Sequence, residues 1–150
     1  MFNGFYQLRQ RPREWYEHFY RILEGLKNSE RTFGQVLQEL LERTGRVEAS
    51  FTSKALATRH PEQPIIDKWV LAFLKRKANL VPPPRSSVDR IERWAQFYDQ
   101  MAQWYRSFGS SPEGAKCIRR FDVICPGRSV CDPKKLDFMI WVTKGNVSLL

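Results

Sequence analysis

Residues 49–74, ASFTSKALATRHPEQPIIDKWVLAFL, predict two helices separated by a turn that prolines bracket. Small residues dominate the first helix, and His60-Pro61 closes it, because the residue before a proline avoids helical backbone angles. After Pro64 the apolar residues recur at three- and four-residue steps, which predicts a helix with a wide apolar face that includes the two isoleucines. The stretch therefore puts Lys54 inside one helix and Asp67 at the start of the next.

The same periodicity extends over the rest of the chain and predicts about seven helices, with no convincing strand pair. Thr32 with Gln35 forms a capping-box pattern, and Gly45 marks the end of the helix that follows. The other predicted helices run from Pro12 to about Leu26, from Ser86 with Asp89 to Gly109, from Ser111-Pro112 through the cysteine region, and from Asp132-Pro133 to Gly145. The predicted fold class is therefore all-α, a compact bundle.

The clearest break in the helical pattern is VPPPRSS, residues 81–87. Each side of it is small for an independent hydrophobic core, whereas 150 residues suffice for one. We therefore expect residues 1–150 to form a single helical domain, in which a stiff proline-rich connector joins two helical halves.

The charge of the chain favours polyanionic partners. Lysine and arginine number 25 against 16 acidic residues, which gives a formal net charge of +9. Phosphates gain Coulomb attraction and counterion release from such a protein, so DNA is the expected partner and RNA the second choice. Most of the aromatic residues have the spacing of a helical core, which favours a packing role over a base-stacking platform.

Several functional classes lack support in the sequence. Cys117, Cys125 and Cys131 do not match common zinc spacings, and their odd number argues against a closed disulfide framework, so we expect no metal site and interpret them as buried small apolar residues. No Walker loop or zincin motif occurs, and no cofactor is expected. No signal-peptide core or long apolar run is present, so we expect no membrane association and a cytoplasmic location, and we leave the oligomeric state open.

The segments SFTSKALA and PIIDKWVLAFL, within residues 32–74, resemble the helix-hairpin-helix DNA glycosylase superfamily. The resemblance implies a glycosylase-like helical core, with Lys54 as the reactive lysine and Asp67 as the catalytic aspartate of an enzyme that excises damaged or modified bases. A carboxylate would stabilise positive charge on the sugar, and a lysine amine of lowered pKa would form an imine. The candidates for phosphate contacts are Arg46, Arg59, Lys68 and Lys75.

Structural interpretations of the same residues stay open. The carboxylate of Asp67 would also stabilise the positive end of the helix dipole, and Lys54 would serve equally on a solvated face or in an ion pair with Glu62 or Asp67. The glycine-rich hairpin of the superfamily is missing. The alternative function is therefore a non-enzymatic helical module that binds DNA or a protein, and a structural or regulatory helical protein is a third option.

Overall fold

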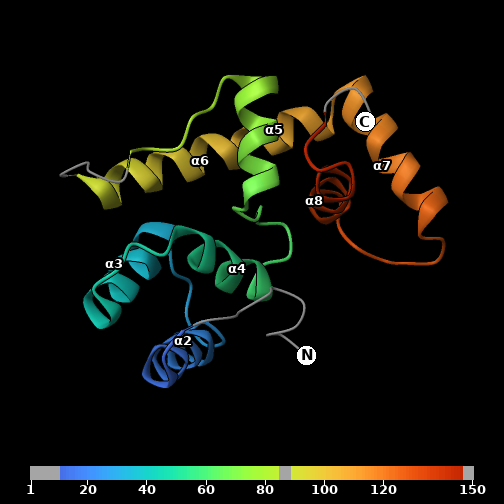
Figure 1. Cartoon of the computed structure of the whole chain (residues 1–150). Helices are drawn as coiled ribbons and strands as arrows, with labels where there is room; N and C mark the ends of the chain where they lie inside the picture. Colours follow the sequence, from blue (N-terminus) through green and yellow to red (C-terminus); the bar gives the residue numbers. More distant parts are fainter. Residues whose placement is uncertain (1–10, 85–88, 147–150) are drawn as a thin grey trace.

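The computed structural model describes residues 11–84 and 89–146, and within them it contains seven α-helices and no strand (Figure 1). The predicted all-α class is confirmed. None of these helices is both long enough and apolar enough to span a bilayer, within the part of the chain that is described. The helices are α2 (Arg13–Gly25), α3 (Phe33–Thr44), α4 (Ala49–Arg59), α5 (Lys68–Ala78), α6 (Arg90–Gly109), α7 (Pro112–Ile124) and α8 (Asp132–Val142).

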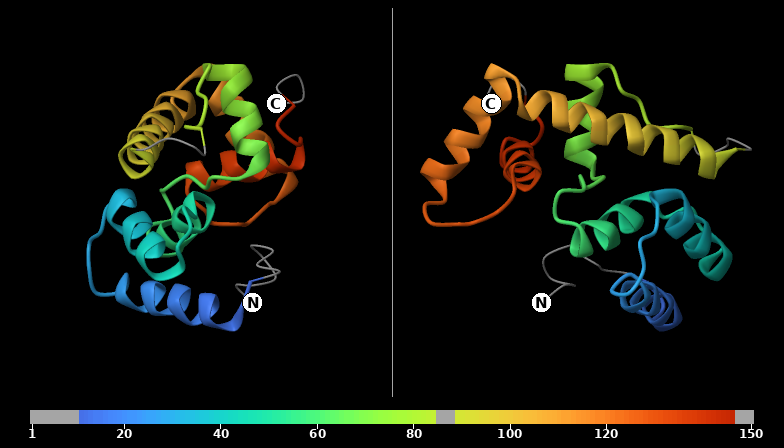
Figure 2. Two further views of the ribbon diagram at one scale, coloured as in Figure 1. Left: turned by 60° about the vertical axis from the view of Figure 1, so that its left-hand side comes forward. Right: turned by 180° about the vertical axis from the view of Figure 1, so that it is seen from behind.

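The helices form two groups that share one hydrophobic core. Helices α2, α3 and α4 lie together on one side, and α5 to α8 lie on the other, as the views in Figures 1 and 2 agree. Helix α3 packs against α2, α4 and α6, while α8 packs against α5, α6 and α7. Buried apolar side chains from all seven helices join in a single cluster. The chain passes between the groups at residues 60–67, whereas the connector at 81–87 joins α5 to α6. The single domain over residues 1–150, with two helical halves joined by this connector, stays a prediction.

Local signals in the sequence begin and end several helices as expected. The Thr32 hydroxyl accepts a hydrogen bond from the backbone N–H of Gln35 at 3.3 Å, and the Gln35 side chain accepts one from the N–H of Thr32 at 2.9 Å. Gly45 ends this helix with φ of 68°, a left-handed angle that glycine adopts without a steric cost. Ser111 caps α7, with Pro112 as the first helical residue. These predictions are confirmed.

Other helix boundaries differ from the expectation. Helix α5 begins at Lys68, so Ile65 and Ile66 lie before the helix, in the segment that approaches α4. Helix α8 ends at Val142, before Gly145, because a further turn follows it in which the Gly145 N–H bonds to the carbonyl of Ile140. Apolar periodicity did not separate a buried residue in a helix from a buried residue in the chain leading to it.

The start of α6 is confirmed only in part. Asp89 is the residue before the helix, and its side chain makes no capping hydrogen bond. Ser86, the other residue of the expected cap, lies outside the described residues. The cysteines also differ from the expectation: Cys117 is fully buried, whereas Cys125 and Cys131 are half-buried, and none of the three forms a disulfide.

Candidate functional site

The residues before α5 are bonded directly to α4. Ser50 donates a hydrogen bond from its hydroxyl to the carbonyl of Ile66 at 2.7 Å, and the N–H of Ile66 donates to the hydroxyl of Ser53 at 2.9 Å. Ser53 is fully buried, so the two segments are in close contact along this side of α4. Small side chains permit this approach, which larger ones would prevent. The next residue in each segment is a candidate for the site, Lys54 in α4 and Asp67 before α5.

Lys54 lies in a partly buried environment that perturbs its ionisation. Desolvation lowers the pKa of Lys54, and the charge of Asp67 opposes this effect only in part. The ammonium also lies 5.5 Å from the centre of the Phe51 ring. A lysine of lowered pKa presents its neutral, nucleophilic form at a lower pH than an exposed lysine does. The structure thus brings Lys54 within electrostatic range of Asp67.

Asp67 is the N-cap of α5. Its Oδ1 atom accepts hydrogen bonds from the N–H groups of Trp69 and Val70, both at 2.8 Å. The predicted alternative role, stabilisation of the helix N-terminus, is therefore confirmed. Both capping bonds use Oδ1, and no hydrogen bond between described residues uses Oδ2. One oxygen of the carboxylate therefore orients the side chain.

Three further polar residues extend the site toward α6 and α8. The hydroxyl of Tyr105 donates to Asp137 Oδ1 at 2.7 Å, and Lys134 Nζ lies 3.0 Å from Asp137 Oδ2 and 2.9 Å from the carbonyl of Gln63. Burial raises the pKa of Tyr105 and of Asp137, and in both cases the negative charge of Asp67 adds to the increase. We call Lys54, Asp67, Tyr105, Lys134 and Asp137 the polar cluster.

Sequence reasoning missed the part of the polar cluster that α6 and α8 supply. Tyr105 was assigned to the apolar face of its helix, and it is buried there. Asp137 follows the buried Leu136, and only 12% of its side chain is exposed. The available signal was an acidic residue at the edge of an inward face, three positions after Lys134. A helical pattern alone does not show what such a residue contacts on another helix.

The four candidates for phosphate contacts are spread over the surface. Arg46 lies before α4 and is 3.3 Å from the buried Glu48, whereas Arg59 is exposed at the other end of this eleven-residue helix, about 16 Å away. Lys68 and Lys75 are exposed on one side of α5, about two turns apart. Only the two lysines form a pair with a common orientation.

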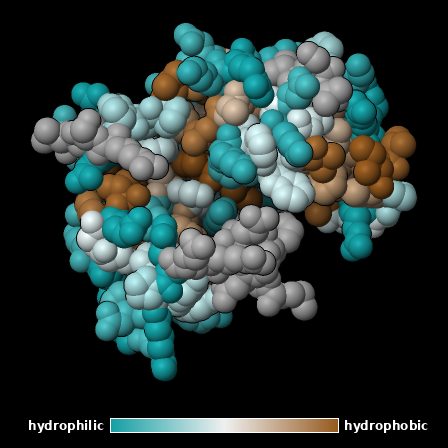
Figure 3. Space-filling model, viewed as in Figure 1, coloured by the Kyte–Doolittle hydropathy of each residue, from teal (hydrophilic) through white to brown (hydrophobic). Residues whose placement is uncertain are grey.

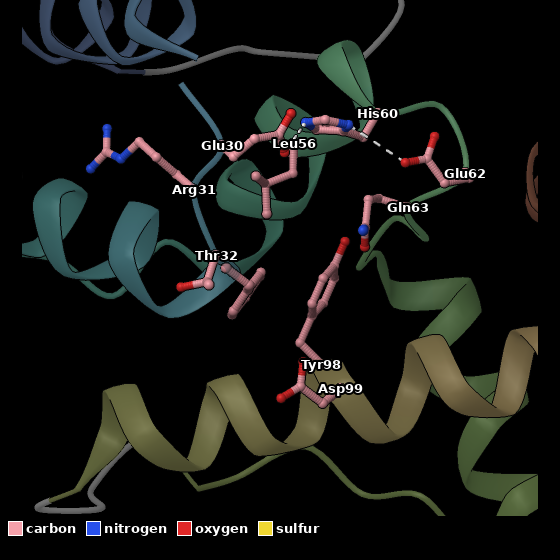
Figure 4. A pocket seen from close by; sticks show the side chains of 10 residues that line it. Glu30, Arg31, Thr32, Leu56, His60, Glu62, Gln63, Tyr98 and Asp99 are labelled. Carbon is pink, nitrogen blue, oxygen red and sulfur yellow. Dashed lines mark ion pairs between the residues drawn. The ribbon is translucent and has the colours of Figure 1, made fainter. Parts of the chain in front are cut away.

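A cavity of about 400 Å³ lies beside the polar cluster, between α3, α4, α6 and residues 60–63 (Figure 4). His60 stands between two carboxylates there, with Nε2 3.5 Å from Glu30 and Nδ1 3.5 Å from Glu62. Arg31 turns away from these groups in Figure 4 and pairs with Glu39 at 2.6 Å. The residues that line the cavity are Glu30, Arg31, Thr32, Phe33, Leu56, His60, Glu62, Gln63, Tyr98 and Asp99.

The charge of this cavity is unsuited to a phosphate. In the described parts of the chain, neither Glu30, Glu62 nor Asp99 forms an ion pair with a lysine or arginine. Burial raises the pKa of Tyr98, and the charges of Asp137, Asp99 and Glu62 raise it further, which reflects a negative potential at this wall. None of the six residues chosen from the sequence lines the cavity.

Comparisons of the chain with protein-family models, with curated proteins and with solved structures return no match. Among the residues that the structure describes, no group of three or more histidine, cysteine, aspartate and glutamate side chains has the arrangement of a metal site.

Proposed function

We propose that the protein binds nucleic acid and excises damaged or modified bases from DNA, with Lys54 as the nucleophile and Asp67 as the carboxylate that stabilises the charged sugar. The observation that supports this proposal is the desolvated Lys54, whose pKa is lowered although Asp67 is near enough to raise it. The net charge of +9 and the resemblance to helix-hairpin-helix DNA glycosylases support the nucleic-acid partner. A cytoplasmic location, with the three thiols unpaired, belongs to the same proposal.

The proposed reaction uses the neutral amine of Lys54. Nζ attacks the anomeric carbon of the sugar, the bond from this carbon to the base breaks, and the base leaves with the electron pair and takes up a proton. The sugar ring then opens, which gives an imine between the sugar carbon and Nζ. The carboxylate of Asp67 stabilises the positive charge that develops on the sugar as the base departs. With an abasic site, the same amine condenses with the sugar aldehyde and water is lost.

A second candidate function is a non-enzymatic module that binds DNA or a protein. The specific observation in its favour is the capping role of Asp67, since two 2.8 Å hydrogen bonds give this residue a structural reason to be there. In that case the lowered pKa of Lys54 follows from packing alone. A module that binds DNA differs from the enzyme in chemistry alone, whereas a module that binds a protein differs from it in its partner as well.

Borohydride trapping separates them. The purified protein is incubated with duplexes that carry an abasic site or oxidised bases, and borohydride reduces any imine to a stable amine, so that protein and DNA migrate together. We expect a covalent product with the wild type and with Lys27→Ala, which removes an exposed lysine outside the candidate site, but none with Lys54→Ala. If no DNA gives a product with the wild type while binding is intact, either a glycosylase that relies on Asp67 alone or the binding module remains, and a base-release assay with Asp67→Asn decides between these two. Loss of binding to every nucleic acid at moderate salt excludes the enzyme and a DNA-binding module, and leaves a module that binds a protein.

A further inference from the structure

The solvent-facing side of α7 combines cations with exposed aliphatic residues. Lys116, Arg119 and Val123 are exposed and occupy one face of the helix, because residues three, four and seven positions apart lie above one another. The opposite face carries Cys117 and Phe121, which are buried in the core. The face is therefore turned to solvent by the way in which the helix packs.

The end of this face is unusually apolar for an exposed surface. Val123 is 80% exposed and Ile124 50% exposed at the C-terminal end of α7, and Val130, in the loop that follows, is 42% exposed. Figure 3 shows apolar surface on this side of the molecule, over α7 and α8. A single exposed valine is ordinary, but three aliphatic residues at one end of a helical hairpin indicate a binding surface. We call Lys116, Arg119, Val123, Ile124, Arg128 and Val130 the α7 surface.

The acidic residues of the same hairpin are neutralised by other cations. Glu113 pairs with Lys77 at 2.7 Å, and Asp122 pairs with Lys135 at 2.8 Å. Asp132 lies 3.7 Å from the same Lys135. No acidic residue in the described ranges forms an ion pair with Lys116, Arg119 or Arg128. These acidic residues therefore do not neutralise the positive charge of the α7 surface, which attracts an anionic partner.

We propose that the α7 surface binds single-stranded nucleic acid, with phosphates at Lys116, Arg119 and Arg128 and an unstacked base against Val123 and Ile124. The inference rests on the proposed function for the nature of the polyanion. Lys116 and Arg119 lie along one face of α7, the exposed Val123 and Ile124 lie at its end, and the exposed Arg128 is in the loop that follows. Cations on both sides of an apolar segment suit a chain of phosphates that carries apolar base faces. An anionic membrane would require a broader apolar face to hold a protein stably.

The salt dependence of binding tests the cations. Fluorescence anisotropy with a labelled single-stranded oligonucleotide gives the slope of the logarithm of the binding constant against the logarithm of salt concentration. The triple variant Lys116→Gln, Arg119→Gln, Arg128→Gln is expected to reduce this slope by about 2, since each phosphate contact on a single strand contributes about 0.7. The matched control, with exposed Arg21, Arg90 and Arg93 replaced by glutamine, carries the same net charge and is expected to keep the wild-type slope.

The aliphatic residues are tested by Val123→Ser with Ile124→Ser. Because these changes remove apolar contact and no charge, affinity is expected to fall roughly tenfold with an unchanged salt slope. Equal slopes for the triple variant and its matched control overturn the inference. A second result would also overturn it. In that result the wild type floats with phosphatidylserine vesicles, and the triple variant no longer floats with them but still binds the oligonucleotide.

Failure of this inference is distinguishable from failure of the proposed function. Borohydride trapping at saturating protein reports the chemistry of Lys54, whereas the salt slope reports the α7 surface. A trapped product together with wild-type slopes in the triple variant overturns the inference and leaves the enzyme. Absence of product together with a slope reduced by about 2 supports the inference and excludes the imine chemistry of Lys54.

Discussion

Replacement of Asp67 separates its role in the fold from its role in chemistry. Asp67→Ala removes the acceptor of two 2.8 Å hydrogen bonds and a negative charge at the start of α5. Loss of a side-chain cap costs about 1 kcal/mol of unfolding free energy, and loss of a favourable charge at a helix N-terminus costs up to about 1 kcal/mol more. We therefore expect Asp67→Ala to destabilise the protein by about 2 kcal/mol, which corresponds to a decrease in Tm of about 4–8 °C for a chain of this size.

Asp67→Ser is the matched variant. Serine is a good N-cap residue, so it retains an oxygen acceptor for the N–H groups of Trp69 and Val70 while the carboxylate is lost. Only the charge contribution is removed, and we expect a destabilisation of about 0.5 kcal/mol. Urea unfolding followed by far-UV circular dichroism measures both variants against the wild type. In the trapping assay, Asp67→Ser is then a folded protein without the carboxylate.

Two outcomes would refute this reasoning. If Asp67→Ala is as stable as the wild type, the two hydrogen bonds do not hold the start of α5. If Asp67→Ser is as unstable as Asp67→Ala, the cost does not come from the cap. A stable Asp67→Ser that releases a damaged base at the wild-type rate would leave the cap argument intact and would remove Asp67 from the proposed chemistry.

Gly114→Ala is expected to destabilise the protein by about 3 kcal/mol in urea unfolding, because an added Cβ would lie 1.9 Å from the carbonyl oxygen of Phe108. Gly25→Ala is the control: an added Cβ there would have no atom within 4 Å, so the variant should be as stable as the wild type or slightly more stable. Burial raises the pKa of Asp137 although Lys134 and the Tyr105 hydroxyl lower it, so the fold favours the protonated form more than the unfolded chain does. The unfolding free energy of the wild type relative to Asp137→Asn should therefore fall as the pH rises from about 4 toward neutrality, and a difference that grows with pH would contradict the raised pKa. Thr32→Ala should cost about 1 kcal/mol through loss of the capping box, and an unchanged Tm would show that the box contributes nothing.

Local sequence signals predicted much of the fold. The capping box of Thr32 and the Ser111-Pro112 start depend on residues within one turn, so the pattern contains the information that the structure uses. The lead into α5 was not predicted, because Ile66 is buried by its bonds to α4 and not by helical periodicity. Tertiary contacts of this kind are absent from any window of the sequence.

In the candidate site, too, the sequence predicted residues that are close together in the chain and missed contacts between residues that are far apart in it. Lys54 and Asp67 were found because they stand in one short stretch. The link from Tyr105 to Asp137 joins residues 32 positions apart, and the bond from Lys134 to Gln63 spans 71 positions. No spacing rule selects such pairs, although each partner has an ordinary place on its own helix. The α7 surface was missed for a related reason, since only the packed structure shows which cations already have acidic partners.

The structural and the catalytic interpretations of Asp67 are compatible, because they use different oxygen atoms. A cap that accepts two hydrogen bonds at Oδ1 restricts the rotation of the carboxylate and keeps Oδ2 at a defined position relative to Lys54. A charge that is to stabilise a transient positive sugar must be oriented in advance, because reorientation during the reaction costs free energy. The cap would supply this orientation without any further residue. Removal of the cap in Asp67→Ala should therefore lower the unfolding free energy. Removal of the carboxylate in Asp67→Ser, with a cap retained, should slow base release, and this second effect decides whether the capped carboxylate also takes part in chemistry.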